Sequence, residues 1–401
     1  LNEKKKKKKI VIFTGNRAEY GLLSPIVKEL NLSNKFITTL LVSGSHLEKD
    51  YGLTINEIES DGYDYESLIE INRKKNVENS NPLAISQGIE KISNYLRKIM
   101  PDYFFVYADR FEGLAAVIAS SQMNIVTCHI EGGDLTEGGA LDDSVRHAMT
   151  KLSHFHFSSN IDAKKRILQL GEEKWRVHNV GFSAIDRIKQ NKLASKIEIE
   201  KKFKFNFDFP IILFTQHSIT TEYKQSINQL KHSIKALKIL AKKNFQILIT
   251  YPNNDMGGDQ IINELKKISK LKNVIVKKSI GSFYYHGILN LRKKHNYKIV
   301  CVGNSSSGIK ETPYFKCAAV NIGSRQLGRL RSTNVIDVDY NCSEIIKSIN
   351  KALFNKSFVK KLKNCKNPYG GGTTSKKIRK IMENLNYSKI KMLRKKMMSY
   401  K

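Results

Sequence analysis

The sequence predicts an α/β protein with two doubly wound parallel sheets. Three observations support this fold class. From residue 10 to residue 183, short apolar runs alternate with segments of helical periodicity, which is the rhythm of βαβ units. Residues 189–208 are rich in lysine and glutamate without a clear period, and the alternation restarts at Pro210. With 401 residues, 40% of them hydrophobic, the chain is long enough for two cores.

In the first half, the apolar runs predict strands and the segments between them predict helices. The expected strands are 10–14, 36–43, 103–108, 125–130, 155–158 and 177–180. One helix is expected from about Glu19. Apolar residues spaced close to 3.6 predict another over 85–99, which Pro101 ends. Because helices separate successive strands, we expect one parallel sheet with helices packed against it.

In the second half, the same pattern predicts a similar unit. The expected strands are 211–215, 245–250, 274–276, 299–302 and 318–322, and the expected helices are 223–241 and 258–268. The change in composition places the domain boundary in 190–208, which we expect to be a linker. After Asn386 the chain is basic, and we expect a disordered or surface-bound tail.

The formal net charge of +32 raises the possibility of nucleic-acid or anionic-membrane binding. The lysines are spread over nearly every expected helix and linker, and no basic stripe is interleaved with aromatic residues that could stack bases. Solvated helix faces are therefore the favoured interpretation, and we expect no nucleic-acid partner. A basic chain would still attract a nucleotide-sugar diphosphate.

The cysteines and the hydropathy of the sequence indicate the cellular compartment in which the protein is expected. Five scattered cysteines without a Cys-x-x-Cys pair indicate neither a disulfide framework nor a thiolate zinc site. No apolar stretch approaches the roughly 20 residues that span a bilayer, and no apolar signal-peptide core follows the first lysines. We therefore expect a cytoplasmic protein without a membrane partner.

Acidic and basic groups follow two of the expected buried strands. Asp109 and Arg110 follow strand 103–108, and Glu131 follows strand 125–130. In an open α/β sheet, ligands bind beyond the carboxyl ends of the strands, so these side chains should share a crevice. A core needs no such charges, because an unpaired buried carboxylate is strongly unfavourable.

A glycine-rich segment, 132–139, leads from Glu131 to the start of a further expected helix. Asp142 and Arg146 are four residues apart and would share one face of this helix. An ordinary helix ion pair is the alternative. Several acids grouped near an anionic substrate suit proton transfer near neutral pH.

Two loops are candidate phosphate sites because each joins a strand to a helix. Loop 15–21, with Arg17, follows the first strand, and loop 303–308 occupies the equivalent place in the second half. Glu311, one turn into the next helix, could bind a ribose diol. Plain turns and a serine N-cap are the alternatives, and the pairing of two such loops favours the phosphate interpretation.

Three histidines lie near expected strands. His217 follows strand 211–215 at the mouth of the second half, where it could contact a phosphate or a leaving group. A hydrogen-bonded loop histidine is the alternative. His154 and His156 alternate along a strand without a partnered acid, so we assign them to packing, and no metal site is predicted.

Taken together, these motifs resemble the hydrolysing UDP-N-acetylglucosamine 2-epimerases, the branch that opens sialic-acid-type sugar pathways. The resemblance covers almost the whole chain. It is carried by Gly15-Asn-Arg-Ala-Glu, Asp109-Arg110, His129-Ile-Glu-Gly-Gly, Asp142-Asp-Ser-Val-Arg-His-Ala-Met-Thr-Lys-Leu-Ser-His, Tyr251-Pro-Asn-Asn-Asp, Gly303-Asn-Ser-Ser-Ser-Gly, Gly323-Ser-Arg-Gln and Asn367-Pro-Tyr-Gly. That family has the GT-B arrangement, in which two Rossmann-like domains face each other across a cleft and the chain crosses back near its carboxyl terminus. The resemblance therefore implies domains at 1–189 and 209–372, and a returning helix with the basic tail in 373–401.

The resemblance also implies roles for individual residues. The residues implied to hold the UDP part are Arg17, Arg110, Ser305, Ser306, Glu311 and Arg325. His46 and His217 are implied as sugar or phosphate contacts, and Arg146 and Asn253 as further substrate-binding residues. Asp109, Glu131 and Asp142 match the acids that move protons at the sugar, and His217 is grouped with them as catalytic.

Three departures from the family pattern stand out. Gly21 occupies a position where many relatives have a serine, so one phosphate or uridine contact is absent. Gly371 interrupts the usual Asn-Pro-Tyr-Gly-Asp-Gly. The loop 136–139 is longer than in some members, which bears on sugar specificity.

The implied reaction converts UDP-N-acetylglucosamine and water to N-acetylmannosamine and UDP. A base removes the C2 proton as UDP leaves, giving a 2-acetamidoglucal. Water then adds at C1 while an acid protonates C2. No redox cofactor or obligatory metal is expected, and the resemblance implies a homodimer. The alternatives are the same reaction on UDP-2,4-diacetamido-2,4,6-trideoxyglucose, as in the legionaminic acid pathway, a GT-B glycosyltransferase, and a non-catalytic nucleic-acid binder.

Overall fold

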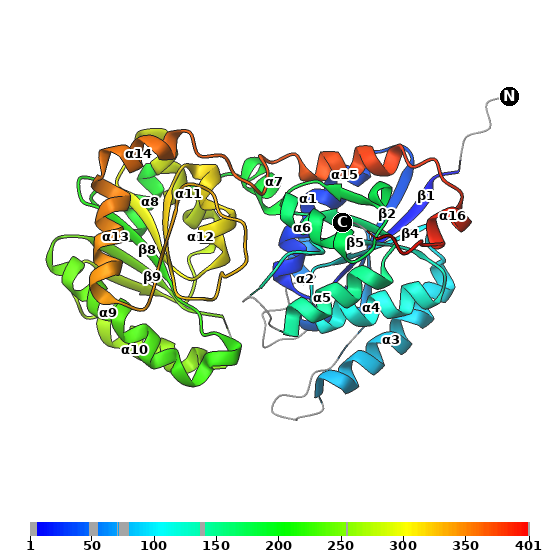
Figure 1. The fold of residues 1–401 in the computed structure, drawn as a ribbon, viewed down its shortest axis with the longest axis horizontal. Helices are drawn as coiled ribbons and strands as arrows, with labels where there is room; N and C mark the ends of the chain where they lie inside the picture. Colours follow the sequence, from blue (N-terminus) through cyan, green and yellow to red (C-terminus); the bar gives the residue numbers. More distant parts are fainter. Residues whose placement is uncertain are drawn as a thin grey trace. The chain divides into compact units, whose positions relative to one another are not determined.

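The computed structural model describes residues 6–47, 55–69, 71, 80–136, 141–253 and 256–399. The chain forms two compact units (Figure 1). The N-terminal unit comprises Leu1–Asp134, Leu141–Lys189 and Tyr369–Lys401, and the C-terminal unit comprises Leu135–Ala140 and Gln190–Pro368. Each contains one parallel sheet, so the predicted fold class is confirmed.

The N-terminal unit has a seven-stranded sheet in the order β3-β2-β1-β4-β5-β6-β7. Its strands are β1 (Lys8–Thr14), β2 (Phe36–Ser43), β3 (Tyr65–Ile69), β4 (Tyr103–Tyr107), β5 (Val126–Ile130), β6 (Phe155–Ser158) and β7 (Val177–Asn179). Its helices are α1 (Arg17–Asn31), α2 (Ile55–Ser60), α3 (Ser80–Ile99), α4 (Phe111–Gln122), α5 (Leu141–Leu152), α6 (Ile161–Gln169), α7 (Ser183–Gln190), α15 (Thr374–Glu383) and α16 (Lys389–Leu393), with short 3₁₀ segments η1 (Gly44–Leu47) and η3 (Lys174–Arg176).

Both faces of this sheet are buried, because alternate residues of each central strand enter different cores. Ile10 and Ile12 of β1 belong to a cluster that includes residues of α1 and α15. Val11 and Phe13 belong to a second cluster, which includes residues of α3 and α4. Strands that are buried on both faces appear in the sequence as continuous apolar runs, and this is why the sequence analysis could predict them.

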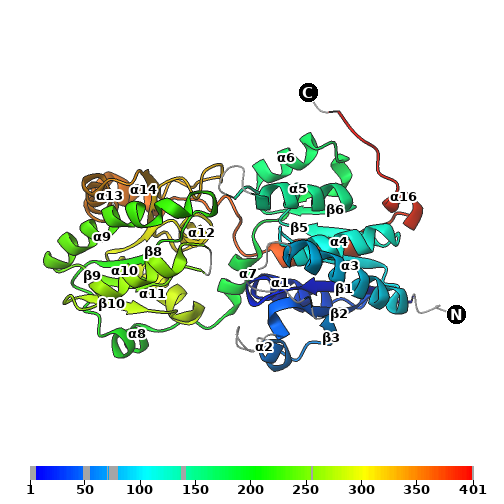
Figure 2. The ribbon, with the colours of Figure 1, turned by 90° about the horizontal axis from the view of Figure 1, so that it is seen from below.

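The C-terminal unit has a six-stranded sheet in the order β10-β9-β8-β11-β12-β13. Its strands are β8 (Ile211–Thr215), β9 (Gln246–Thr250), β10 (Val274–Lys277), β11 (Ile299–Gly303), β12 (Ala318–Ile322) and β13 (Val335–Val338). Its helices are α8 (Lys196–Phe203), α9 (Ser226–Lys242), α10 (Gly258–Ile268), α11 (Gly281–His295), α12 (Ser306–Lys310), α13 (Cys342–Phe354) and α14 (Lys356–Lys363), with η4 (Thr220–Gln225) and η5 (Thr312–Phe315). Figure 2 shows this sheet between its helices, with α9 and α13 on one side and α11 on the other.

The strand order reverses once in each sheet. In the N-terminal unit the reversal lies between β1 and β4, and in the C-terminal unit between β8 and β11. At such a point, neighbouring loops diverge to opposite faces of the sheet and leave a crevice at the carboxyl ends of the strands. This places loop 15–17 beside residues 108–110, and residues 216–217 beside loop 303–308.

The segment expected as a linker contains helix α8. Ser195 and Glu198 form a capping box at its start, and Phe203 packs edge-on against Tyr284 of α11, with ring centroids 5.4 Å apart. The sequence shows no clean period here because only two of the helix residues, Ile199 and Phe203, are buried. The segment is therefore part of the C-terminal unit.

The end of the chain returns to the N-terminal unit. Helix α15 packs against α1, where Ile378 and Met382 enter the core (Figure 1). The tail that follows is held by the buried guanidinium of Arg176. This group donates to the carbonyls of Met392 (2.6 Å) and Arg394 (2.6 Å). The described part of the tail, through residue 399, is thus bound to the unit through its backbone.

Within the described ranges, no helix combines the length and the apolar character that crossing a bilayer requires.

Candidate active site

Two residues with strained backbone lie at the carboxyl ends of β4 and β5. Ala108 and Glu131 have backbone φ angles of +53° and +63°, which residues other than glycine rarely adopt. Their amides still donate across the sheet, to Ile130 (3.0 Å) and Phe157 (2.9 Å). The chain thus turns sharply as soon as each strand ends. Strain of this kind, on the order of 1–3 kcal/mol per residue, concentrates at functional sites.

Arg146 of α5 joins Asp109 to a second acid. The nearly buried guanidinium forms an ion pair with Asp109 and lies 3.3 Å from Asp143 Oδ1. Asp142, four residues before Arg146, is exposed in the first turn of the helix, whereas Asp143 is buried. The proton-transfer role of Asp142 stays a prediction.

Glu131 is paired with Tyr107, the last residue of β4. The two buried side chains share a hydrogen bond from the phenol to Glu131 Oε2. Burial and the neighbouring carboxylate raise the pKa of Tyr107 well above its usual range, so the phenol stays protonated and donates. The sequence analysis missed Tyr107, because a tyrosine that ends an apolar run is indistinguishable from a core residue.

His129 braces the same strand ends. Its Nε2 lies 2.8 Å from the carbonyl oxygen of Ala108, which can only accept, so the proton is on Nε2. Its Nδ1 then accepts from the Thr150 hydroxyl at 3.1 Å. Burial lowers the pKa of His129 to about 3, so the ring is neutral. It holds the strained residue Ala108 in place and is unsuited to carry protons.

At the predicted anion-binding loop after β1, the hydrogen-bond donors contact carboxylates of the protein itself. The Gly15 N–H donates to Glu19 Oε2 at 2.8 Å. Arg110 makes a two-pronged contact with Glu112, at 3.0 and 3.1 Å. Burial, reinforced by Glu112 and opposed by Arg110, raises the pKa of Glu19 to about 7. A backbone donor and a guanidinium therefore already face carboxylate oxygens at this point.

Arg17 and His46 differ in accessibility. Arg17 is exposed at the start of α1 and pairs with Glu57. His46 is fully buried, with Nε2 3.0 Å from the Thr14 hydroxyl, and burial lowers its pKa to about 4. The predicted contact between His46 and a sugar or phosphate stays a prediction.

In the C-terminal unit, Asn304 ties the loop after β11 to the loop after β8. Its side chain accepts from the His217 N–H at 2.7 Å and donates to the His217 carbonyl at 2.9 Å. Gly303 permits this approach: its φ is +123°, and a Cβ there would lie 1.9 Å from the Thr215 carbonyl oxygen. The sequence analysis gave Asn304 no role, although its position between Gly303 and a run of serines could have indicated a structural role in this loop.

Three of the predicted site residues, His217, Asn253 and Arg325, lie close to these hydrogen bonds of Asn304. His217 Nδ1 lies 2.9 Å from Asn253 Oδ1 and 3.1 Å from the Asn253 backbone nitrogen. Burial, together with the charge of Arg325, lowers the pKa of His217 to about 4. Arg325 donates to the Asn304 carbonyl at 3.4 Å. A neutral imidazole and a guanidinium thus lie at one edge of the sheet, which suits an anionic group.

Glu311 lies at the end of the short helix α12. It accepts from His286 Nε2 at 2.9 Å and from the Ser307 hydroxyl at 3.0 Å. Burial acts to raise its pKa, but these hydrogen bonds outweigh burial and the pKa is lowered. Glu311 is therefore an ionised acceptor at neutral pH. Ser305 and Ser306, which open the helix, are half-buried.

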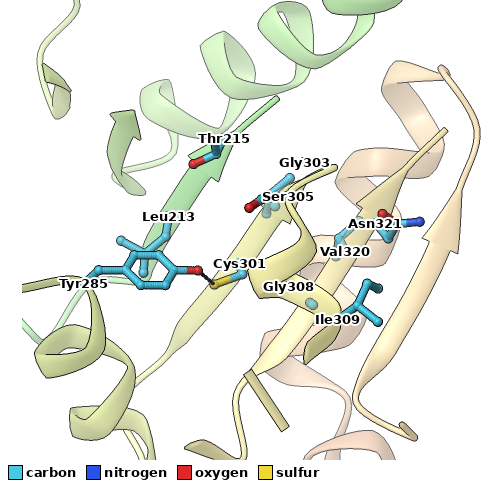
Figure 3. Close-up of a pocket in the computed structure, with 12 residues that line it drawn as sticks. Leu213, Thr215, Tyr285, Cys301, Gly303, Ser305, Gly308, Ile309, Val320 and Asn321 are labelled. Carbon is cyan, nitrogen blue, oxygen red and sulfur yellow. Dashed lines mark hydrogen bonds between the residues drawn. The ribbon is translucent and has the colours of Figure 1, made fainter. Parts of the chain in front are cut away.

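Behind the serine loop lies a cavity of about 20 Å³ (Figure 3). Its lining includes Tyr285, Cys301, Ser305 and Gly308. The Tyr285 hydroxyl lies 3.5 Å from Cys301 Sγ and 2.8 Å from the Ser307 hydroxyl oxygen. The cavity has room for about one water molecule, so a nucleotide could not enter it.

Some predicted features lie outside the described residues. These are residues 137–139 of the loop linked to sugar specificity and residues 254–255 of the motif that begins at Tyr251. In the part of the chain that the structure describes, no group of three His, Cys, Asp or Glu side chains could hold a metal ion.

Two parallel-sheet α/β units, each with one strand-order reversal, define a GT-B-like fold. A sequence model of the UDP-N-acetylglucosamine 2-epimerase family matches residues 28–383. The chain belongs to this family, and it is an enzyme of that family.

Individual relatives support this assignment. The chain is 35% identical to the GDP/UDP-N,N'-diacetylbacillosamine 2-epimerase (hydrolyzing) of Campylobacter jejuni, over 84% of this chain and 85% of that protein. It is 32% identical to the UDP-N,N'-diacetylbacillosamine 2-epimerase (hydrolyzing) of Legionella pneumophila, over 94% and 96%. The fold matches the crystal structure of the Neisseria meningitidis UDP-GlcNAc 2-epimerase bound to UDP-GlcNAc, with a TM-score of 0.72, 22% identity, and coverage of 94% and 99%.

Proposed function

We propose that this protein is a hydrolysing 2-epimerase that converts UDP-N-acetylglucosamine and water to N-acetylmannosamine and UDP. One observation carries the proposal. Asp109 and Glu131 follow the adjacent strands β4 and β5, of which β4 borders the strand-order reversal, in a chain whose family has 2-epimerases as members. Each carboxylate has a dedicated donor, Arg146 or Tyr107.

The proposed chemistry is an elimination followed by a hydration. One carboxylate takes the C2 proton while the C1–O bond breaks, and the electron pair of that bond leaves with UDP, giving a 2-acetamidoglucal. Water then adds at C1 as a carboxylic acid delivers a proton to the opposite face of C2. Asp109, Glu131 and Asp142 are the candidate proton carriers.

Residues of the C-terminal unit would receive the leaving group. We assign the diphosphate to Arg325 and His217, and the ribose to Glu311, with Ser305, Ser306 and Asn253 as further contacts. In the N-terminal unit, Arg17, Arg110 and Arg146 would add positive charge. Fixed donors near the departing diphosphate stabilise its growing charge without reorganisation.

The reaction in heavy water tests this scheme. The released sugar should carry deuterium at C2, seen as loss of that ring-proton signal, with UDP formed in equal amount. A product that keeps its original C2 proton would contradict the mechanism. Release of N-acetylmannosamine without an added acceptor also separates an epimerase from a GT-B glycosyltransferase.

A second candidate substrate follows from the names of the two relatives. Both are named as 2-epimerases of N,N'-diacetylbacillosamine linked to a nucleotide, the UDP-2,4-diacetamido-2,4,6-trideoxy sugar of the alternative reaction. A side-by-side comparison of kcat/KM for the two UDP-sugars decides between them, and a ratio of 100 or more in either direction would identify the substrate. The homodimer is a further prediction, which sedimentation can check.

A further inference from the structure

A second cavity of the C-terminal unit shares no lining residue with the candidate site. Its volume is about 390 Å³. The lining residues are Arg292, Lys293, Lys294, Asn296, Lys316, Leu362 and Lys363. Five of these seven carry positive charge and none is acidic, so the cavity is strongly electropositive.

The cations converge from three separate elements. Arg292, Lys293 and Lys294 lie in the last turn of α11, Lys316 follows η5, and Lys363 ends α14. The Lys293 ammonium lies 4.1 Å from the centroid of the Tyr314 ring. These positions are set by the tertiary structure, because residues 292–294, 316 and 363 are far apart in the sequence.

Arg292 is the buried member of the group. It is 8% exposed, and its guanidinium donates to the side-chain oxygen of Asn296. Among the described residues, no carboxylate forms an ion pair with it. Burial lowers its pKa. A buried cation without an opposite charge is unfavourable, so an anion in the cavity would supply the missing partner.

Cations at the ends of helices have an ordinary explanation, which is attraction to the helix dipole. Each helix carboxyl terminus carries about half a negative charge. The ends of α11 and α14 therefore offset about one of the five charges and leave about four. Burial, followed by the charges of Lys316 and Lys294, lowers the pKa of Lys293. These ammonium groups are therefore close enough to repel one another.

We propose that this cavity binds a compact polyphosphate, meaning a di- or triphosphate group, at a site separate from that of the UDP-sugar. A phosphate chain brings several charged oxygens that match guanidinium and ammonium donors. The lining holds no aromatic ring and one apolar side chain, Leu362. The site therefore recognises phosphate charge and not a base.

Calorimetric titration of the full-length protein with sodium pyrophosphate, at constant ionic strength, tests the proposal. The variant Arg325→Gln serves as the background, because it weakens the diphosphate site proposed for UDP. We expect one pyrophosphate per chain. Binding should weaken at least tenfold in the double variant Lys293→Gln, Lys316→Gln. The matched control, Lys270→Gln with Lys272→Gln, removes two exposed lysines beside α10 and should bind as the unaltered protein does. Circular dichroism checks that both variants are folded.

Each outcome decides something. Undetectable pyrophosphate binding, or equal losses in both variants, would overturn the proposal. So would much tighter binding of a single-stranded oligonucleotide through the same lysines, since that would make the cavity part of a nucleic-acid surface. Equal affinity for inorganic triphosphate and ATP would support a phosphate chain as the ligand, and much tighter ATP binding would overturn the proposal, since the site would then recognise a base. Absence of epimerase turnover with pyrophosphate binding intact would count against the proposed function alone.

Discussion

At the scale of single residues, the candidate site depends on a few backbone positions and on the donors paired with each acid. Positive φ at Ala108 and Glu131 turns the chain where two strands end, and Gly303 allows Asn304 to clamp His217. None of these contacts is local in sequence except the turn itself. The residue types at the strand ends were predictable, but their partners were not.

Tyr107→Phe should reduce kcat about 10- to 100-fold with little change in KM. The variant removes the donor to Glu131, and a lost hydrogen bond to a charged group is worth about 1.5–3 kcal/mol. Steady-state kinetics would show the separate effects on kcat and KM.

Tyr103→Phe is the matched control, since Tyr103 lies in the same strand but its hydroxyl contacts Met392 Sδ at 3.9 Å. Unchanged kinetics in Tyr107→Phe, or an equal loss in both variants, would contradict a positioning role for Tyr107.

Gly303→Ala should destabilise the C-terminal unit by roughly 2–4 kcal/mol. The new Cβ would meet the Thr215 carbonyl oxygen at 1.9 Å and would impose an unfavourable φ. Gly308→Ala is the control in the same loop, because its Cβ would make an ordinary 3.7 Å contact with Ala319. Denaturant unfolding followed by circular dichroism compares them, and similar stabilities would refute the argument.

At the scale of elements, the central strands were predicted well because both of their faces are buried. The edge strands β3 and β13 were missed, since β13 is only partly buried and its pattern includes Asp337. Helix α8 was missed because it buries two residues, and helix α12 ends before Glu311 instead of carrying it. Weakly buried elements leave a weak periodic signal in the sequence.

Arg176→Ala should release the basic tail and cost about 3–5 kcal/mol of stability. The variant leaves three tail carbonyls, of Lys391, Met392 and Arg394, without their buried donor. Arg394→Ala keeps the carbonyl and removes an exposed side chain, so it should be near neutral. Limited proteolysis after residue 386 reports the release of the tail directly. Equal cleavage rates in both variants would show that Arg176 does not hold the tail.

At the scale of the whole molecule, buried neutral histidines make the N-terminal unit sensitive to acid. Burial lowers the pKa values of His46, His129, His154 and His156 to between about 3 and 4. The unfolded chain takes up protons below about pH 6.5, whereas the folded unit does not until pH 3–4. Stability should therefore fall as the pH drops from 6.5 to 4, by several kcal/mol in all. Glu19, with its raised pKa, opposes this trend between about pH 4.5 and 7.

Trp175, the single tryptophan of the chain, lies in this unit and reports its unfolding by fluorescence. Denaturant midpoints at pH 7.5, 6, 5 and 4.5 should decline steadily with acidity. A constant midpoint over that range would show that these histidines titrate normally.

The sequence by itself determined the α/β class, the central strands and the identity of the polar residues just beyond them. These features follow from local periodicity and from the rule that parallel strands end at one edge. Only the tertiary structure decided that Arg146 pairs with Asp109 and Asp143, that His46 is buried, and that Arg176 holds the tail. Such contacts join residues distant in the chain, and they depend on strand order and helix rotation, which a periodic pattern does not specify.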